Sequence, residues 1–214
     1  MPVITKWSNV AVNVQSALAA AKTITAISKA STAVVSSTAH GYLAGDYVVL
    51  SAQGMYQVNA RCFRVGTVPD ANTFQLESVD SSTFATFESG SAQKVTFGTT
   101  LSTLVSVNAS GGDFDFIDTT TIHSDSKTQI PGQASPLTFN FESYWDPSDV
   151  GLLALRSAST SQAQRAVQFS FANGQKFVFN GYIGCSLTPT GSAQDLVKTG
   201  VTITALAGPM AYAS

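Results

Sequence analysis

Large apolar residues alternate with polar ones along several short segments of this chain, and this period of two is typical of half-buried β-strands. The alternation is clearest in four segments, at 137–142, 167–171, 177–180 and 201–206. Val10, Val12 and Val14 repeat the pattern near the N-terminus. Because polar residues interrupt that stretch, segment 8–18 predicts a strand and not a secretory signal, which needs an unbroken apolar core of about 7–15 residues.

A turn signal, Asn173–Gly174, lies between two of these strands. Asn and Gly both tolerate the positive φ that a two-residue hairpin turn requires. The spacing therefore predicts a β-hairpin over 165–184.

One segment, 147–157, predicts an α-helix. Asp146 is the expected N-cap and Pro147 the first helical residue, and Asp149 places an acid in the first turn, where the helix dipole favours it. Val150 and Leu153 are expected to lead the apolar face, with Leu152 and Leu155 beside them. A short amphipathic helix of this kind is expected to pack on a sheet.

Residues 22–97 look like a separate small β unit. Short strands are expected at 23–27, 47–50, 58–65 and 74–76, with Gly, Pro and Asn in the turns between them. The Ser/Thr/Phe run at 78–91 predicts an exposed hairpin or loop. We therefore expect a small β-barrel of residues 22–97 inserted into a main β domain built from 1–21 and 98–214.

The amino-acid composition argues against several classes of function. Of 214 residues only 11% are charged, with 11 basic and 13 acidic side chains, and Ser and Thr make up about a quarter of the chain. The absence of a basic excess argues against a protein that grips nucleic-acid phosphates. No segment approaches the roughly 18 consecutive apolar residues of a membrane span. Cys62 and Cys185 are expected to be buried free thiols, with a single disulfide as the alternative.

The residues that could carry catalysis or bind a metal do not form a recognised set. His40 and His123 are the only histidines, and both fall in turn or loop sequence. Ser124 and Asp125 adjoin His123 in the chain, so a catalytic triad is not expected. Three acids lack the features of a calcium loop and are expected to be solvated, namely Asp113, Asp115 and Asp118. The sequence predicts no enzyme, no metal site and no cofactor.

The polar stretch 106–136 predicts long loops, and loops of more than about 15 residues are usually functional or disordered. A monomer has no evident need for the 119–136 part. This indicates an oligomer in which a neighbouring copy orders it.

Several motifs resemble the tail tube proteins of tailed bacteriophages, of the siphophage type. They occur in order over 110–214, and they are Phe116–Thr121, Ile130–Gly132, the strand from Leu137, Tyr144–Pro147, the Phe-rich hairpin and Cys185–Thr188. One departure is Gln133-Ala134-Ser135, where relatives often have Leu-Lys-Asp. The segment His40–Leu76 resembles a small β-barrel module of phage structural proteins, which also forms part of ubiquitin-activating enzymes; its common Asn-Gly is Asn59-Ala60 here.

The resemblance implies a mainly β protomer, a tail-tube β-sandwich or barrel with one flanking α-helix and an inserted small β-barrel. Such protomers close a β-barrel across subunits into hexameric rings, and the rings stack into a tube that conducts the genome into the host. The helix is expected outside the bore and the insert on the outer surface. Contacts between rings are expected from the loop residues Asp118, Thr119, Thr120, Ile130, Pro131 and Gly132.

The implied partners are further copies of the chain and the tail tape-measure, tail terminator and distal tail proteins. Genomic DNA would pass without specific binding, and no membrane is involved. The implied location is the virion tail, after assembly in the host bacterial cytoplasm.

Two other readings stay open at this point. One is the tube protein of a contractile injection or secretion system, although an outward insert would obstruct a sheath. The other is a carbohydrate-binding β-protein with an aromatic site at Tyr42, Tyr47 and Tyr56, residues that we expect instead to pack inside the small barrel.

Overall fold

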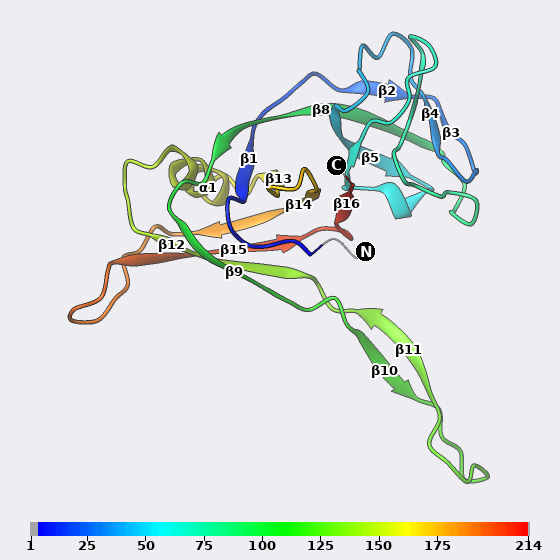
Figure 1. Ribbon diagram of the computed structural model, residues 1–214. Helices are drawn as coiled ribbons and strands as arrows, with labels where there is room; N and C mark the ends of the chain where they lie inside the picture. The colour runs from blue at the N-terminus through cyan, green and yellow to red at the C-terminus, as the bar shows by residue number, and fades with distance from the viewer. Residues whose placement is uncertain (1–3, 214) are drawn as a thin grey trace.

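The computed structural model describes residues 4–213, which form a mainly β structure with one α-helix (Figure 1). In chain order the elements are β1 (Ala11–Leu18), β2 (Lys22–Ile24), β3 (Ala26–Ile27), β4 (Val34–Ser36), β5 (Tyr47–Gln53), the 3₁₀ turn η1 (Tyr56–Val58), β6 (Cys62–Arg64), β7 (Thr73–Gln75), β8 (Ser89–Thr100), β9 (Leu104–Ser110), β10 (Phe114–Asp118), β11 (Gln129–Ala134), β12 (Thr138–Tyr144), α1 (Val150–Thr160), β13 (Gln164–Ser170), β14 (Lys176–Cys185), β15 (Lys198–Ala205) and β16 (Met210–Tyr212). The predicted mainly β class with one α-helix is confirmed.

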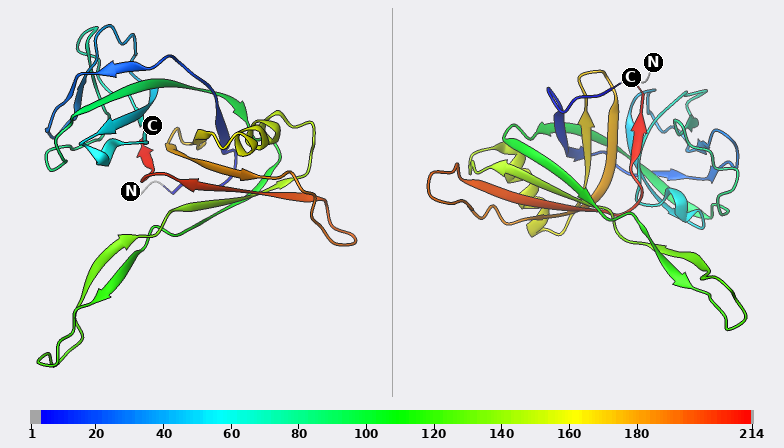
Figure 2. Two further views of the ribbon diagram at one scale, coloured as in Figure 1. Left: turned by 180° about the vertical axis from the view of Figure 1, so that it is seen from behind. Right: turned by 60° about the horizontal axis from the view of Figure 1, so that its bottom comes forward.

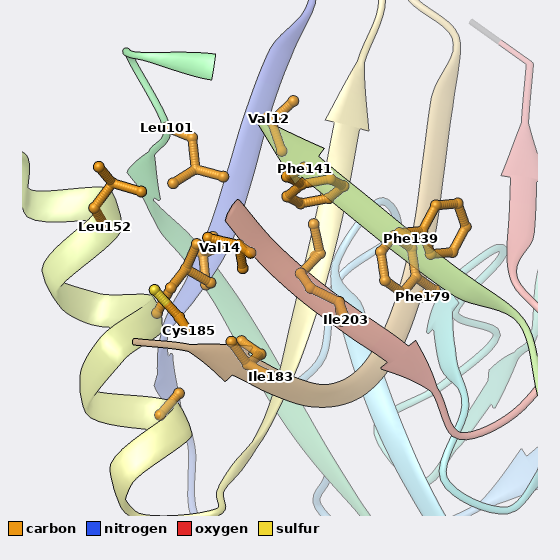
Figure 3. Packing of buried hydrophobic residues seen from close by; sticks show 14 of the residues in the cluster. Val12, Val14, Leu101, Phe139, Phe141, Leu152, Phe179, Ile183, Cys185 and Ile203 are labelled. Carbon is orange, nitrogen blue, oxygen red and sulfur yellow. The ribbon is translucent and has the colours of Figure 1, made fainter. Parts of the chain in front are cut away.

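Most strands belong to one antiparallel sheet that curls on itself. Its order is β6-β5-β8-β1-β13-β14-β15-β12-β9, with β16 paired to β14 and β2 paired to β8. The curl brings β12 against β13 and β14, so that the ring centroids of Phe139 and Phe179 are 4.3 Å apart and those of Phe141 and Phe169 are 5.9 Å apart. The core of the resulting sandwich lies between the two halves of the sheet (Figure 3).

The strands predicted from alternation are present, because one face of each is buried in this core. In β12 and β15 the paired residues Phe139 and Ile203 point inward, and their polar neighbours point outward. The predicted hairpin is also present as β13 and β14. Its turn differs, because the strands pair as far as Phe171 and Gln175, and only Gly174 in the intervening loop has positive φ (+87°).

The helix begins later than its sequence predicts. Asp149 is the N-cap, and its Oδ1 accepts a hydrogen bond of 2.8 Å from the Leu152 amide. Asp146 instead accepts from Ser148 in the preceding turn, so Asp146 was the wrong cap. The apolar face is also different: Leu152, Leu155 and Ala158 are buried, whereas Val150 and Leu153 are exposed. Leu152 packs beside Leu101 at one open side of the sandwich (Figure 3).

A second apolar cluster fills the small unit near the top of Figure 1. Its fully buried members all fall between Ile24 and Ala92, and they include Phe63, Phe74 and Leu50. The strands of the small unit belong to two different sheets. Strands β5 and β6 extend the main sheet through β8, whereas β3, β4 and β7 form a separate three-stranded sheet. Strand β8 (Ser89–Thr100) crosses the expected boundary at residue 97.

The segment 78–91 is not simply an exposed loop. Val79 and Ser81 are buried, and the Ser81 hydroxyl donates a 2.6 Å hydrogen bond to the Ser28 carbonyl. This bond ties the segment to the start of the small unit, and from Ser89 the chain is already part of β8.

The stretch predicted as loops at 106–136 is largely β-structure. Strand β9 continues to Ser110 along β12, and the chain then forms a separate two-stranded hairpin, β10–β11. This hairpin and the tip that joins its strands, residues 111–136, are called the arm below. The arm projects from the body of the molecule in all three views (Figures 1 and 2).

Candidate assembly surfaces

The arm holds the six residues predicted to make contacts between copies. Ile130, Pro131 and Gly132 lie on β11, Asp118 ends β10, and Thr119 and Thr120 follow it. The pairs Ile117–Ile130 and Phe116–Pro131 bring the two groups together across the hairpin. The arm thus unites segments that are about ten residues apart in sequence, as strand pairing requires.

Local hydrogen bonds shape the end of the hairpin. The Thr119 amide donates to the Thr128 carbonyl at 2.9 Å, and the Thr120 amide donates to Asp118 Oδ1 at 2.8 Å. Hydrogen bonding from the Thr120 side chain and backbone lowers the pKa of the Asp118 carboxyl. Asp118 is therefore a turn-forming carboxylate that stays ionised in solution.

The arm also exposes large apolar side chains, of which the sequence analysis had selected only Ile130. The exposed fractions are 57% for Phe114, 65% for Phe116, 55% for Ile117, 97% for Ile122 and 51% for Ile130. Phe116 and Ile117 are successive strand residues, so they lie on opposite faces of the hairpin. The available signal was the apolar residues of Phe114–Asp118, which the sequence analysis placed in a polar loop and, from Phe116 on, in a family motif.

A polar surface covers the outer side of β9, β12, β15 and the end of β14. Pairing places its side chains in rows across the strands, such as Asn108, Asn140 and Thr202, and Ser110, Thr138 and Thr204. Thr202 Oγ1 donates to Asn140 Oδ1 at 3.1 Å. We call this surface the bare face, because no described segment packs on it and its side chains are mostly exposed.

The charges on the bare face balance each other. Lys198 Nζ lies 3.3 Å from Glu142 Oε1, and both side chains are partly exposed. Uncharged Ser, Thr, Asn and Gly supply most of the remaining positions on these strands. The bare face is therefore polar, hydrated and close to neutral.

The small unit covers the other outer side of the sheet. There Val95, Ala166 and Val178 form a buried cluster with Cys62 and Tyr212. The Tyr212 hydroxyl accepts a 2.8 Å hydrogen bond from the backbone amide of residue 64, and Asn180 Nδ2 donates to the carbonyl of residue 60 at 3.1 Å. Of the two outer sides of the sandwich, one is thus sealed and apolar and the other is polar and uncovered.

The bare face ends in two strand edges. Within residues 4–213, β9 pairs only with β12, so its outer edge lacks a strand partner. On the other side, β13 accompanies β14 only as far as Tyr182. A cavity of about 480 Å³ flanks this end of β14, lined by Ser159, Gln162, Tyr182 and Ile183. The edge of β9 is open to pairing with another chain, whereas α1 partly covers the end of β14, where the Cys185 amide donates a 3.1 Å hydrogen bond to the Ser159 hydroxyl.

The histidines and cysteines occupy structural positions. His40 is buried in a turn, where its Nδ1 accepts a 2.9 Å hydrogen bond from the Tyr42 amide. His123 is exposed near the tip of the arm. Cys62 and Cys185 are buried free thiols, and burial raises the pKa of both.

The residues of the other sites considered in the sequence analysis do not come together in the fold. Asp113, Asp115 and Asp118 are exposed along the arm, and the part of the chain that the structure describes contains no group of three or more metal-binding side chains. Of the three tyrosines expected inside the small barrel, only Tyr42 is buried in its core. Tyr47 is half-buried against the cluster that contains Val95 and Tyr212, and Tyr56 is 72% exposed. Over residues 4–213, no helix is both long and apolar enough to cross a membrane.

Comparison with known proteins identifies one family. A family model described as a phage tail tube protein matches residues 53–214, which is more than half of the chain. The search of curated proteins gave no match.

Proposed function

The chain belongs to the phage tail tube protein family, and from this premise we propose that its copies close into hexameric rings that stack into the tube through which the genome leaves the virion. The protein is a structural component of the virion tail, and the family assembles into a tube with other tail components. The proposal concerns the ring, its bore and the contacts between copies.

The bare face carries this proposal, because it is the surface suited to line the bore. A bore lining must be polar and hydrated, and it must be free of covering segments. The small unit seals the opposite outer side through Val178 and Tyr212, so with the bare face inward the small unit lies on the outside. Helix α1 packs at the side of the sandwich, away from the bare face, and stays outside the bore as well.

Ring closure would use the two ends of the bare face, namely the free edge of β9 and the end of β14 beside α1. In a ring, β9 of one copy meets the end of β14 of the next, so that each copy uses two different surfaces. Such a head-to-tail contact closes when its rotation fits a whole number of copies. Closure protects edges that would otherwise promote aggregation.

The charge of the bare face suits a conduit for DNA. Proteins that bind DNA neutralise phosphates with Lys and Arg, and they release counterions as they do so. Lys198 is paired with Glu142, and neither Asn140 nor Thr202 carries a charge. DNA would therefore find no sites to hold it as it passes.

Within this assembly the arm makes the contacts between rings, through Asp118, Thr119, Thr120 and Ile130–Gly132. The ends of the tube would meet the tape-measure, terminator and distal tail proteins, and assembly would take place in the host bacterial cytoplasm. The role is structural, with no catalytic step and no cofactor.

Microscopy and cysteine labelling test the proposal together. The purified protein is expected to form tubes of uniform width in negative stain. Thr202→Cys, on the bare face, should react in tubes with a small maleimide but not with one attached to a polymer wider than the bore. Leu43→Cys is the matched control, because Leu43 is 68% exposed on the small unit and should react with both reagents.

The two possible failures can be told apart. A protein that remains monomeric at every concentration contradicts the tube. Tubes in which Thr202→Cys reacts with the large reagent as fast as Leu43→Cys contradict the bore lining alone. The native thiols contribute little background because both are buried.

A further inference from the structure

A groove with a mixed part and an apolar part runs along the free edge of the sheet beside β9, and Ser102 and Ser106 belong to the mixed part. Two cavities of about 350 and 310 Å³ form it, and they share Trp7 and Val107. The second cavity opens toward the sandwich core, and aromatic side chains dominate its lining, namely Trp7, Phe139, Phe169, Phe171 and Phe177. We call the two cavities together the Trp7 groove.

Trp7 covers this groove only in part. Its ring centroid lies 6.0 Å from that of Phe169 and 5.7 Å from that of Phe171, both in edge contacts. Even so, 65% of Trp7 remains exposed. A large aromatic residue held in this way offers an apolar surface for a partner, because aromatic side chains dominate the energetics of protein interfaces.

The arm exposes apolar side chains that no other described segment covers. Phe116 lies on one face, and the Ile117–Ile130 pair lies on the other. A two-stranded hairpin with no third strand or helix against it is marginally stable in water. An arm with apolar residues on both faces therefore fits a surface that covers it in the assembled state.

The groove and the arm match in chemistry. The side chains that line the second cavity are uncharged, as the entry of an aromatic ring requires. Beside the groove, Lys6 is exposed next to Trp7, and on the arm Asp115 and Asp118 flank Phe116. Opposite charges at the rim favour the correct docking of two apolar surfaces.

The arm of the same chain does not fill the groove. It projects from the body in every view (Figures 1 and 2), and neither cavity has an arm residue in its lining. A second copy is always at hand in a protein whose family forms a tube. We propose that the arm of one copy docks in the Trp7 groove of a neighbouring copy, with Phe116 beside Trp7 and Phe139; this inference rests on the tube assembly proposed above.

Cross-linking between two single variants tests the docking directly. Ala134→Cys and Ala109→Cys are purified separately, mixed, assembled and oxidised. Ala134 is exposed on β11 opposite Phe114, so the cysteine leaves Phe116 in place. Ala109 is an exposed residue of β9 that lines the second cavity. A disulfide-linked dimer that contains one copy of each variant is expected. The matched control replaces Ala109→Cys with Leu43→Cys, which should give no such dimer.

Trp7 fluorescence gives a second readout. The chain has two tryptophans, so Trp145→Phe leaves Trp7 as the only emitter. Its emission should shift to shorter wavelength on assembly, because docking removes the ring from water. Phe116→Ala should raise the concentration needed for assembly at least about tenfold, and Phe116→Leu should restore most of the loss. Because Phe116 is exposed in the single chain, neither change should alter the circular dichroism of the monomer.

The outcomes separate the two proposals. Uniform tubes with no mixed disulfide and unchanged Trp7 emission would overturn the docking and leave the tube function intact. A wild-type protein that forms no tubes would contradict the proposed function itself. A mixed disulfide together with a shifted Trp7 emission supports both.

Discussion

At the scale of single residues, burial raises the pKa of several ionisable groups of the small unit and of the sheet that it covers. The Tyr42 side chain is buried, and its hydroxyl donates a 2.8 Å hydrogen bond to the Ala92 carbonyl. Burial, with a smaller contribution from the negative charge of Asp46, raises the pKa of Tyr42 from 10.0 to about 12. Burial raises the pKa values of Cys62 and Tyr212 in the same direction.

These shifts predict a loss of stability in alkali. In the unfolded chain Tyr42 ionises near pH 10.0, whereas in the folded protein it stays neutral to about pH 12. Its contribution is complete below the unfolded pKa and is lost as the pH rises from about 10 to 12, by about 2 to 3 kcal/mol. Urea unfolding of the unassembled protein at a series of pH values measures this loss.

Tyr42→Phe should reduce the alkaline slope, at a cost of about 1 kcal/mol at neutral pH for the lost hydrogen bond. Tyr56→Phe is the control, because Tyr56 is exposed and its phenol stays in water on folding. Equal slopes for Tyr42→Phe and Tyr56→Phe would contradict the assignment to Tyr42.

At the scale of elements, helix α1 shows how one residue fixes where an element begins. Both Asp146 and Asp149 have the chemistry of a cap, and Pro147 favours the earlier start. Only Asp149 is buried against the sheet, where it also bonds the Ser102 hydroxyl. The helix starts where its cap can also bond the turn between β8 and β9.

Asp149→Ala should therefore destabilise the protein more than Asp146→Ala does. We expect a loss of about 1 to 2 kcal/mol for Asp149→Ala, because the Leu152 amide and the Ser102 hydroxyl both lose a partner. Asp146→Ala should cost less, since it removes contacts only with neighbouring Ser148. The free energy of unfolding of the two variants decides the point, and equal losses would count against Asp149 as the cap.

At the scale of the whole molecule, two apolar cores share one continuous sheet. The cluster of the small unit is almost closed on itself, with Met210 as its one partly buried member from outside residues 24–92. Strand β8 connects the cores, since it pairs with β1 at one end and with β5 along the other. This supports the proposal that residues 22–97 are an insertion, with the refinement that β8 has to be kept in any deletion.

A deletion designed from the pairing of β2 with β8 tests this proposal. Ile24 and Gly90 are paired, so Asn-Gly in place of residues 25–89 should join β2 and β8 in a tight hairpin. Val95→Thr and Val178→Thr reduce the apolar surface that the deletion uncovers. We expect the shortened chain to fold and to form tubes of the same bore in the electron microscope.

A shortened chain with the expected circular dichroism that does not polymerise would place the small unit in the assembly interface. The full-length chain with the same two threonines is the control. It separates the effect of the substitutions from that of the deletion.

The sequence by itself determined the local elements and the family. Alternation over 137–142 and 201–206, the position of the hairpin over 165–184 and the presence of one helix depend on backbone geometry over a few residues, which local patterns record. The sequence analysis also expected Cys62 and Cys185 to be buried free thiols, because the chain has only two cysteines and they lie far apart in sequence.

Tertiary structure decided the rest, because it depends on contacts between distant residues. Strand β9 alternates apolar and polar residues from Val105 to Ser110, a signal that the sequence analysis missed when it took 106–136 as one polar stretch. The apolar residues of the arm face solvent on both sides and give no clear periodic signal. Both outer sides of the sandwich carry polar strand residues in the sequence. The packing of residue 64 against Tyr212, 148 positions further along, determines which side is sealed and which stays open.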